Sequence, residues 1–108
     1  MVTVDNTLPE DYSEAVIAFR KSVAHAPKEN VSFILQSMMN PMDEFYSQLQ
    51  KNPQLGPAMA KEFVKPIKTP WGFVKPLDFI NAHAVEILSQ PMQDKLFLFA
   101  RDLRQFSR

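Results

Sequence analysis

The chain has 108 residues, of which twelve are basic and twelve acidic, and it contains no cysteine. This length suits one compact domain, and an apolar fraction of 45% is enough to build its core. The lack of cysteine excludes disulfides, thiolate nucleophiles and cysteine-based zinc sites, and the zero net charge disfavours a protein that coats DNA through a large positive field.

Charge is nevertheless distributed unevenly along the chain. Residues 1–54 carry four Lys/Arg against seven Asp/Glu, whereas residues 55–108 carry eight against five, so the two halves differ in sign. The N-terminal residues show neither the basic nor the apolar region of a secretion signal. No apolar run approaches the roughly 20 residues of a membrane span. We therefore expect a cytoplasmic protein with no transmembrane segment.

The first helix is predicted to begin close to Thr7. Residues 1–6 offer little to bury and are expected to form a flexible N-terminal arm, with residues 7–108 as a single helical domain. Thr7 and Glu10 have the spacing of a capping box, in which the two side chains satisfy the first free amides of a helix. Apolar residues then recur at intervals of three and four until Pro27, which ends the helix.

Prolines mark the starts of the following helices, because each stands behind a residue suited to the N-cap position. This arrangement occurs at Asn40-Pro41, Asn52-Pro53 and Gly56-Pro57. It predicts three short helices, over residues 31–39, 42–51 and 57–64. Each is near or below the length at which an isolated helix is stable in water, so all three depend on tertiary packing.

The C-terminal third contains the strongest periodic signal. Pro76 can open a helix that runs through Leu88, and Pro91 supplies a break and a new start. The last helix has a heptad-like apolar seam formed by Met92, Leu96, Phe99, Leu103 and Phe106.

That seam does not account for Phe97, Leu98 and Ala100, which widen the apolar face. Either this helix is central in a monomeric bundle and packs on both sides, or the second face pairs with another copy or a partner protein. The predicted fold is all-α, a single compact domain of five or six short proline-initiated helices. One ordered proline-rich loop, at about 65–76, interrupts it.

The loop belongs to a stretch in which Phe-Val-Lys-Pro occurs twice, at residues 63–66 and 73–76, with the only tryptophan between the copies. Thr69-Pro70-Trp71-Gly72 suits a β-turn with proline at its second position and glycine at its fourth. The two copies could then flank the turn as a short irregular hairpin, with the prolines confining the strands to edges. The alternative is an irregular loop without strands.

No residue pattern predicts an enzyme, a metal site or a cofactor. The two glycines exclude a phosphate-binding loop, and no serine has a recognisable catalytic histidine context. His83 and Glu86 have the spacing of one half of a carboxylate-bridged metal site, but the second half is missing. We therefore predict no catalytic residues, no metal and no cofactor.

Binding of another protein is the leading functional hypothesis. A pre-ordered loop with an exposed tryptophan loses little entropy on docking, and the predicted contact residues are Lys65, Lys68, Pro70, Trp71, Phe73 and Lys75. A structural alternative buries the aromatic side chains in the core and leaves the lysines solvated. A second alternative binds single-stranded nucleic acid or an anionic surface through Lys61, Lys65, Lys68 and Lys75 together with Arg101, Arg104 and Arg108.

Overall fold

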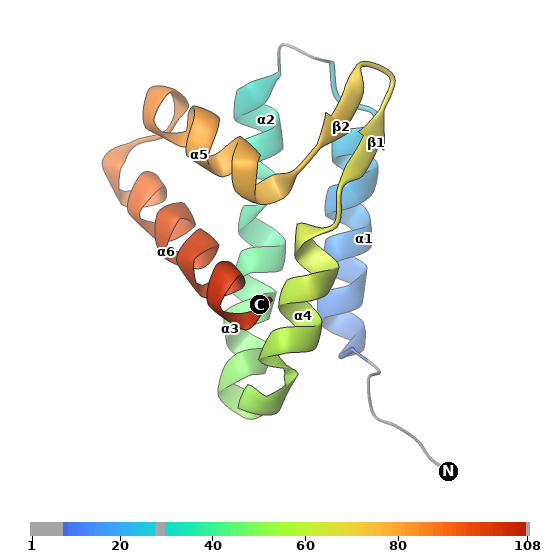
Figure 1. Cartoon of the computed structure of the whole chain (residues 1–108), viewed down its shortest axis with the longest axis vertical. Coiled ribbons are helices and arrows are strands. Elements are labelled where there is room, and N and C mark those ends of the chain that lie inside the picture. The colour runs from blue at the N-terminus through green and yellow to red at the C-terminus, as the bar shows by residue number, and fades with distance from the viewer. Residues whose placement is uncertain (1–7, 28–29, 108) are drawn as a thin grey trace.

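A computed structural model describes residues 8–27 and 30–107 of the chain. Helices account for most of these residues, and the only strands within them form one short hairpin (Figure 1). The elements are α1 (Glu10–Ala24), α2 (Val31–Gln36), α3 (Met39–Lys51), the 3-10 turn η1 (Pro53–Leu55), α4 (Gly56–Val64), β1 (Ile67–Thr69), β2 (Gly72–Val74), α5 (Pro76–Ile87) and α6 (Gln90–Phe106). The predicted all-α fold is confirmed, and the predicted arm at residues 1–6 lies outside the described residues.

Prolines stand at the starts of several helical elements, as the sequence predicts. Pro53, Pro57, Pro76 and Pro91 each occupy one of the first two positions of η1, α4, α5 and α6. The amides at these positions have no partner inside a helix, so the missing N–H of proline removes no hydrogen bond there. The side chain of Asn52 completes the start of η1 by accepting a hydrogen bond from the backbone N–H of Gln54 at 3.2 Å.

Two predicted helix starts are wrong by a few residues. The first helix begins at Glu10 behind Pro9, not at the capping box, and Thr7 lies outside the described residues. The predicted break at Asn40-Pro41 instead falls inside the first turn of α3, which starts at Met39. A proline is tolerated in any of the unpaired first-turn positions, so its presence does not fix which residue comes first.

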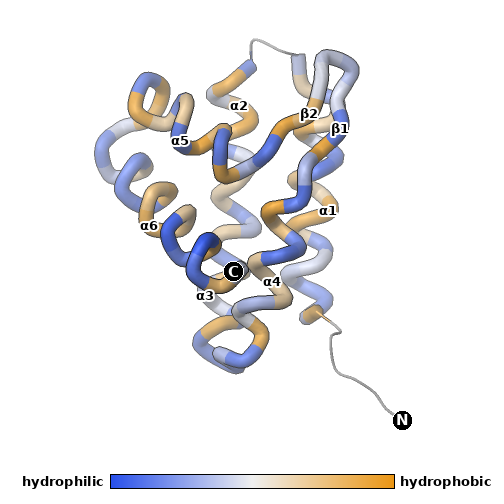
Figure 2. Tube along the Cα trace, in the orientation of Figure 1, coloured by the Kyte–Doolittle hydropathy of each residue, from blue (hydrophilic) through white to orange (hydrophobic). Residues whose placement is uncertain are grey.

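The core is built around aromatic side chains that come from α1, α3, α4 and α6. Phe45 is fully buried and lies edge-on against Phe99, with ring centroids 5.3 Å apart. Tyr12 is also fully buried, and its hydroxyl donates to the backbone carbonyl of Met59 at 2.7 Å. Figure 2 shows hydrophobic and hydrophilic residues alternating along the helices, as expected when each helix turns one face to a shared core.

Helix α6 packs on both α4 and α5, and its predicted seam faces the core, with Met92 and Phe106 at its two ends only partly buried. Leu96, Phe99 and Leu103 are completely buried. Ala100, predicted as part of an oligomer face, is also completely buried within this chain, because the neighbouring helices already cover that side of α6. Of the other two residues in that prediction, Phe97 is half-buried against the core and Leu98 stays 48% exposed.

No helix in residues 8–27 and 30–107 is both long and apolar enough to cross a membrane.

Candidate partner-binding surface

The stretch predicted to contact a partner folds as an antiparallel hairpin. Strands β1 and β2 pair in the register Ile67 with Val74, Lys68 with Phe73, and Thr69 with Gly72, and the turn between them consists of Pro70 and Trp71. Of the two structures left open by the sequence, the hairpin is therefore the one observed. It lies beside the C-terminal end of α1 and leads directly into α5 (Figure 1).

Thr69 and Gly72 give the turn its geometry. The hydroxyl of Thr69 accepts from the backbone N–H of Trp71 at 3.2 Å and donates to the carbonyl of Gly72 at 2.5 Å. Gly72 has a φ of 130°, a backbone conformation that side chains with a Cβ rarely adopt. The predicted β-turn with glycine at its fourth position is thus confirmed, and the glycine is required by the backbone.

Two sets of side-chain hydrogen bonds hold the hairpin against α1 and the residues that follow it. At the tip, the indole N–H of Trp71 donates to the carbonyl of Ala26 at 2.9 Å. At the base, the guanidinium of Arg20 donates to the carbonyls of Lys65 at 3.1 Å and Pro66 at 2.9 Å. Trp71 is therefore half-buried and partly structural, and it presents only part of its ring to solvent.

The two faces of the hairpin differ in burial, as alternation along a strand requires. Ile67 and Val74 form a cross-strand pair on the inner face, where they are 3% and 2% exposed. Lys68 and Phe73 form the pair on the outer face, and both are exposed. The Phe73 side chain is 67% exposed, the highest value for any large apolar side chain among the described residues.

Three lysines lie on the hairpin or close to its strands in the chain. Lys65 forms an ion pair with Glu62 at 3.0 Å on the surface. Lys68 and Lys75 are exposed and have no ion-pair partner in the part of the chain that the structure describes. We use the term hairpin surface for the six residues of the predicted contact, which the structure brings together: Lys65, Lys68, Pro70, Trp71, Phe73 and Lys75.

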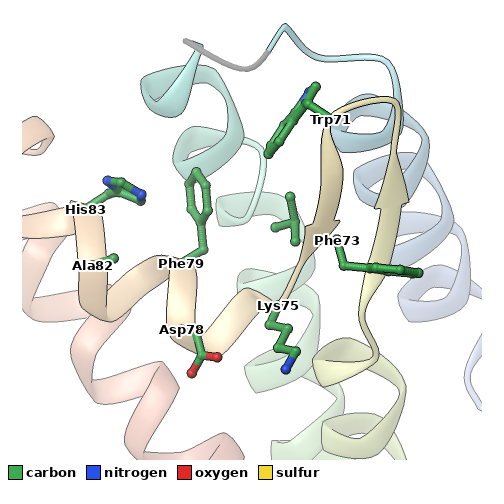
Figure 3. Close-up of a pocket in the computed structure, with 8 residues that line it drawn as sticks. Trp71, Phe73, Lys75, Asp78, Phe79, Ala82 and His83 are labelled. Carbon is green, nitrogen blue, oxygen red and sulfur yellow. The ribbon is translucent and has the colours of Figure 1, made fainter.

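A groove of about 300 Å³ adjoins the hairpin surface, between β2 and α5. In Figure 3 the rings of Trp71 and Phe79 face this space, while the ring of Phe73 points away from it. The ring of His83 lies against that of Phe79, with centroids 4.6 Å apart. The residues that line the groove are Trp71, Phe73, Val74, Lys75, Asp78, Phe79, Ala82 and His83.

The α5 side of this groove was missed by the sequence analysis. Asp78 with Ala82, and Phe79 with His83, are separated by four residues and therefore share one side of a helix. That spacing was visible in the sequence, but nothing in it indicated which side of α5 would meet the hairpin. Glu86, whose spacing from His83 matches one half of a carboxylate-bridged metal site, is exposed and does not line the groove.

The described cations of the nucleic-acid alternative are spread over α4, the hairpin with its flanking residues, and α6. Lys61 lies on α4 and is exposed, whereas Arg101 pairs with Asp102 on α6 at 3.2 Å. Arg104 is exposed near the C-terminal end of α6, which lies well away from the hairpin in Figure 1. Arg108 lies outside the described residues.

Comparison with known proteins adds no relative: no family model, no curated protein and no solved structure matches this chain.

The hydrogen bond of Trp71 can be tested by a substitution that keeps an aromatic ring at this position. We expect Trp71→Phe to lower the free energy of unfolding by about 1 kcal/mol, because the carbonyl of Ala26 loses its indole partner. Urea denaturation followed by far-UV circular dichroism measures the change. An unchanged midpoint would show that the indole N–H does not hold the tip of the hairpin.

Proposed function

We propose that this chain is a small non-enzymatic protein that binds another protein through the hairpin surface, as an adaptor, inhibitor or regulatory protein. The observation that carries the proposal is the exposure of Phe73 at 67% on a rigidly held hairpin. A large aromatic side chain in water is the usual anchor of a protein interface, where its burial gives most of the binding energy.

The way the hairpin is fixed also supports binding. Trp71 and Arg20 tie its tip and base to α1 and the following residues, so little conformational entropy remains to be lost on docking. The same bonds change the role expected of Trp71. Phe73 becomes the central contact, and Trp71 contributes the exposed part of its ring while holding the turn.

Charge indicates the kind of partner. Lys68 lies directly across from Phe73, and Lys75 follows two residues later, and neither is neutralised by a carboxylate in the described part of the chain. Opposite charges across an interface steer association and disfavour wrong partners. We therefore propose a partner surface with an apolar pocket for Phe73 and carboxylates around that pocket.

The test compares two exposed apolar residues of one chain. Partners captured from a native cell extract by cross-linking are identified, and the affinity of each is measured for Phe73→Ala and Val85→Ala. Val85 on α5 is 63% exposed and lies outside the hairpin surface, so it is a matched control. We expect Phe73→Ala to weaken binding by about 2 kcal/mol or more, roughly thirtyfold, and Val85→Ala to have little effect. Equal effects of the two changes would contradict the proposal.

Binding of single-stranded nucleic acid or an anionic surface remains the alternative. The salt dependence of the affinity distinguishes it from protein binding. A phosphate binder loses affinity steeply with added salt and depends on its lysines, whereas an interface anchored by Phe73 depends mainly on the ring. The cytoplasmic location and a homodimer also stay predictions. Cell fractionation and light scattering measure them directly.

A further inference from the structure

Within the described residues, the hairpin has only two strands, so β2 has a backbone edge beside the groove that pairs with no third strand. In an antiparallel pair the residues opposite each other alternate between exchanging hydrogen bonds and pointing their N–H and C=O groups outward. Thr69 and Gly72 close a two-residue turn and take the bonded role. The middle pair, Lys68 and Phe73, therefore directs its backbone groups away from the partner strand. Outside the two strands, no backbone group of the described residues bonds to those of Phe73.

This edge borders the groove between β2 and α5. Phe73 lines the groove although its ring points away from it (Figure 3), so its backbone is the part that borders the space. Trp71 at one end and Phe79 along the α5 side supply apolar walls, and Lys75 and Asp78 lie at the other end. A donor and an acceptor spaced for a β-ladder thus lie at the border of an open groove with aromatic walls.

The opposite edge of the hairpin differs in character. There the outward backbone groups belong to Lys68, and an exposed lysine on an edge strand discourages pairing with another chain. The β2 edge carries an exposed phenylalanine at the equivalent position, which favours cross-strand contact with an incoming strand. Of the two edges, β2 is the one suited to accept a strand.

We propose that the partner binds as an extended segment that adds a third strand to β2, and this inference rests on the proposed protein-binding function. The residue opposite Phe73 exchanges both backbone hydrogen bonds with it and lies beside its ring on the outer face. The two neighbours of that residue point inward, to Trp71 and Phe79. A carboxylate at the end near Lys75 complements the unpaired ammonium group.

The probe is a displayed library of peptides about ten residues long, with fixed glutamates at both ends, a random centre and no tryptophan. It is selected against the full chain, and the tightest peptide is synthesised. Trp71 is the only tryptophan of the chain and lines the groove, so its fluorescence reports binding. If no peptide is enriched over a protein-free control, the strand proposal is wrong.

Proline variants test the backbone bond itself, because proline removes one N–H and is tolerated on an edge strand where that N–H faces outward. We expect Phe73→Pro to bind the selected peptide about tenfold more weakly than Phe73→Ala, which lacks the ring but keeps the donor. The matched pair on the other edge, Lys68→Pro and Lys68→Ala, should differ less than about twofold. Circular dichroism verifies that all four variants fold. If Phe73→Pro does not fold, hydrogen exchange of the wild-type chain is measured instead.

In that measurement the amide of Phe73 should exchange at least about tenfold more slowly when the peptide is bound. Equal affinities of Phe73→Pro and Phe73→Ala, or an unprotected Phe73 amide, overturn strand addition. Binding of the natural partner to the same variants then distinguishes strand addition from the broader proposal of protein binding. If its binding depends on the ring of Phe73 but not on the N–H, the hairpin surface still binds protein by another mode. If its binding depends on neither, the proposed function fails as well.

Discussion

Replacing Phe63 by alanine should lower the free energy of unfolding by about 3–5 kcal/mol, whereas the same change at Phe73 should lower it by less than about 0.5 kcal/mol. Phe63 is fully buried and stacks on Phe19, with ring centroids 5.0 Å apart and planes 11° from parallel. It also lies edge-on to Phe99 at 5.1 Å. Removing its ring opens a cavity among three helices, while the ring of Phe73 already lies in water.

Urea denaturation followed by far-UV circular dichroism measures both variants. A loss of this size is a large fraction of the roughly 5–15 kcal/mol that holds a small domain together, so Phe63→Ala should be partly unfolded on mild heating. Phe63→Leu, which keeps most of the buried volume, should fall between the wild type and Phe63→Ala. Similar midpoints for Phe63→Ala and Phe73→Ala would contradict the burial assigned to both side chains.

Phe63 and Phe73 differ in a way that the sequence alone does not predict. Both begin a Phe-Val-Lys-Pro tetrapeptide, yet the first copy closes α4 and the second leaves β2 to open α5. Pro66 follows a helix end and Pro76 is a first helical residue, so each proline obeys the same local rule. The tetrapeptide alone does not determine which phenylalanine faces the core, because that depends on the elements that pack against it.

The helical fold could be predicted because apolar spacing and proline position are local properties. The seam of α6 is the clearest case, since Leu96, Phe99 and Leu103 follow a helical period and are all buried. The starts of α1 and α3 were less predictable. Several first-turn positions accept proline equally well, so the pattern leaves the first residue open by a few positions.

The candidate site likewise has features that the sequence predicts and features that it does not. The exposure of Lys68 and Phe73 follows from strand alternation once Ile67 is assigned to the core. The double role of Trp71 does not follow from a local pattern, because its hydrogen bond to Ala26 joins residues 45 positions apart in the chain. The α5 wall of the groove depends on how a helix is placed against a hairpin, and no local pattern encodes that placement.

Alkaline pH should destabilise this protein more than a protein whose tyrosines are exposed. Burial, with a smaller contribution from Glu62, raises the pKa of Tyr12 above its ordinary value. Burial and the hydrogen bond to Asp102 raise the pKa of Tyr46 in the same direction. Both phenols therefore stay neutral in the folded chain at a pH near 10, at which exposed tyrosines in the unfolded chain release their protons. The unfolded state then binds fewer protons, so the free energy of unfolding falls as pH rises.

The sign and size of this effect are measured by comparing the wild type with Tyr12→Phe. The stability due to neutral Tyr12 is complete below about pH 10 and should decrease above it by up to about 1.4 kcal/mol per pH unit. Near pH 7 the variant should be about 1 kcal/mol less stable, because the hydrogen bond from Tyr12 to Met59 is lost. The variant should decline less steeply above pH 10, so the two stability curves converge. Parallel curves would show that Tyr12 ionises alike in the folded and unfolded states.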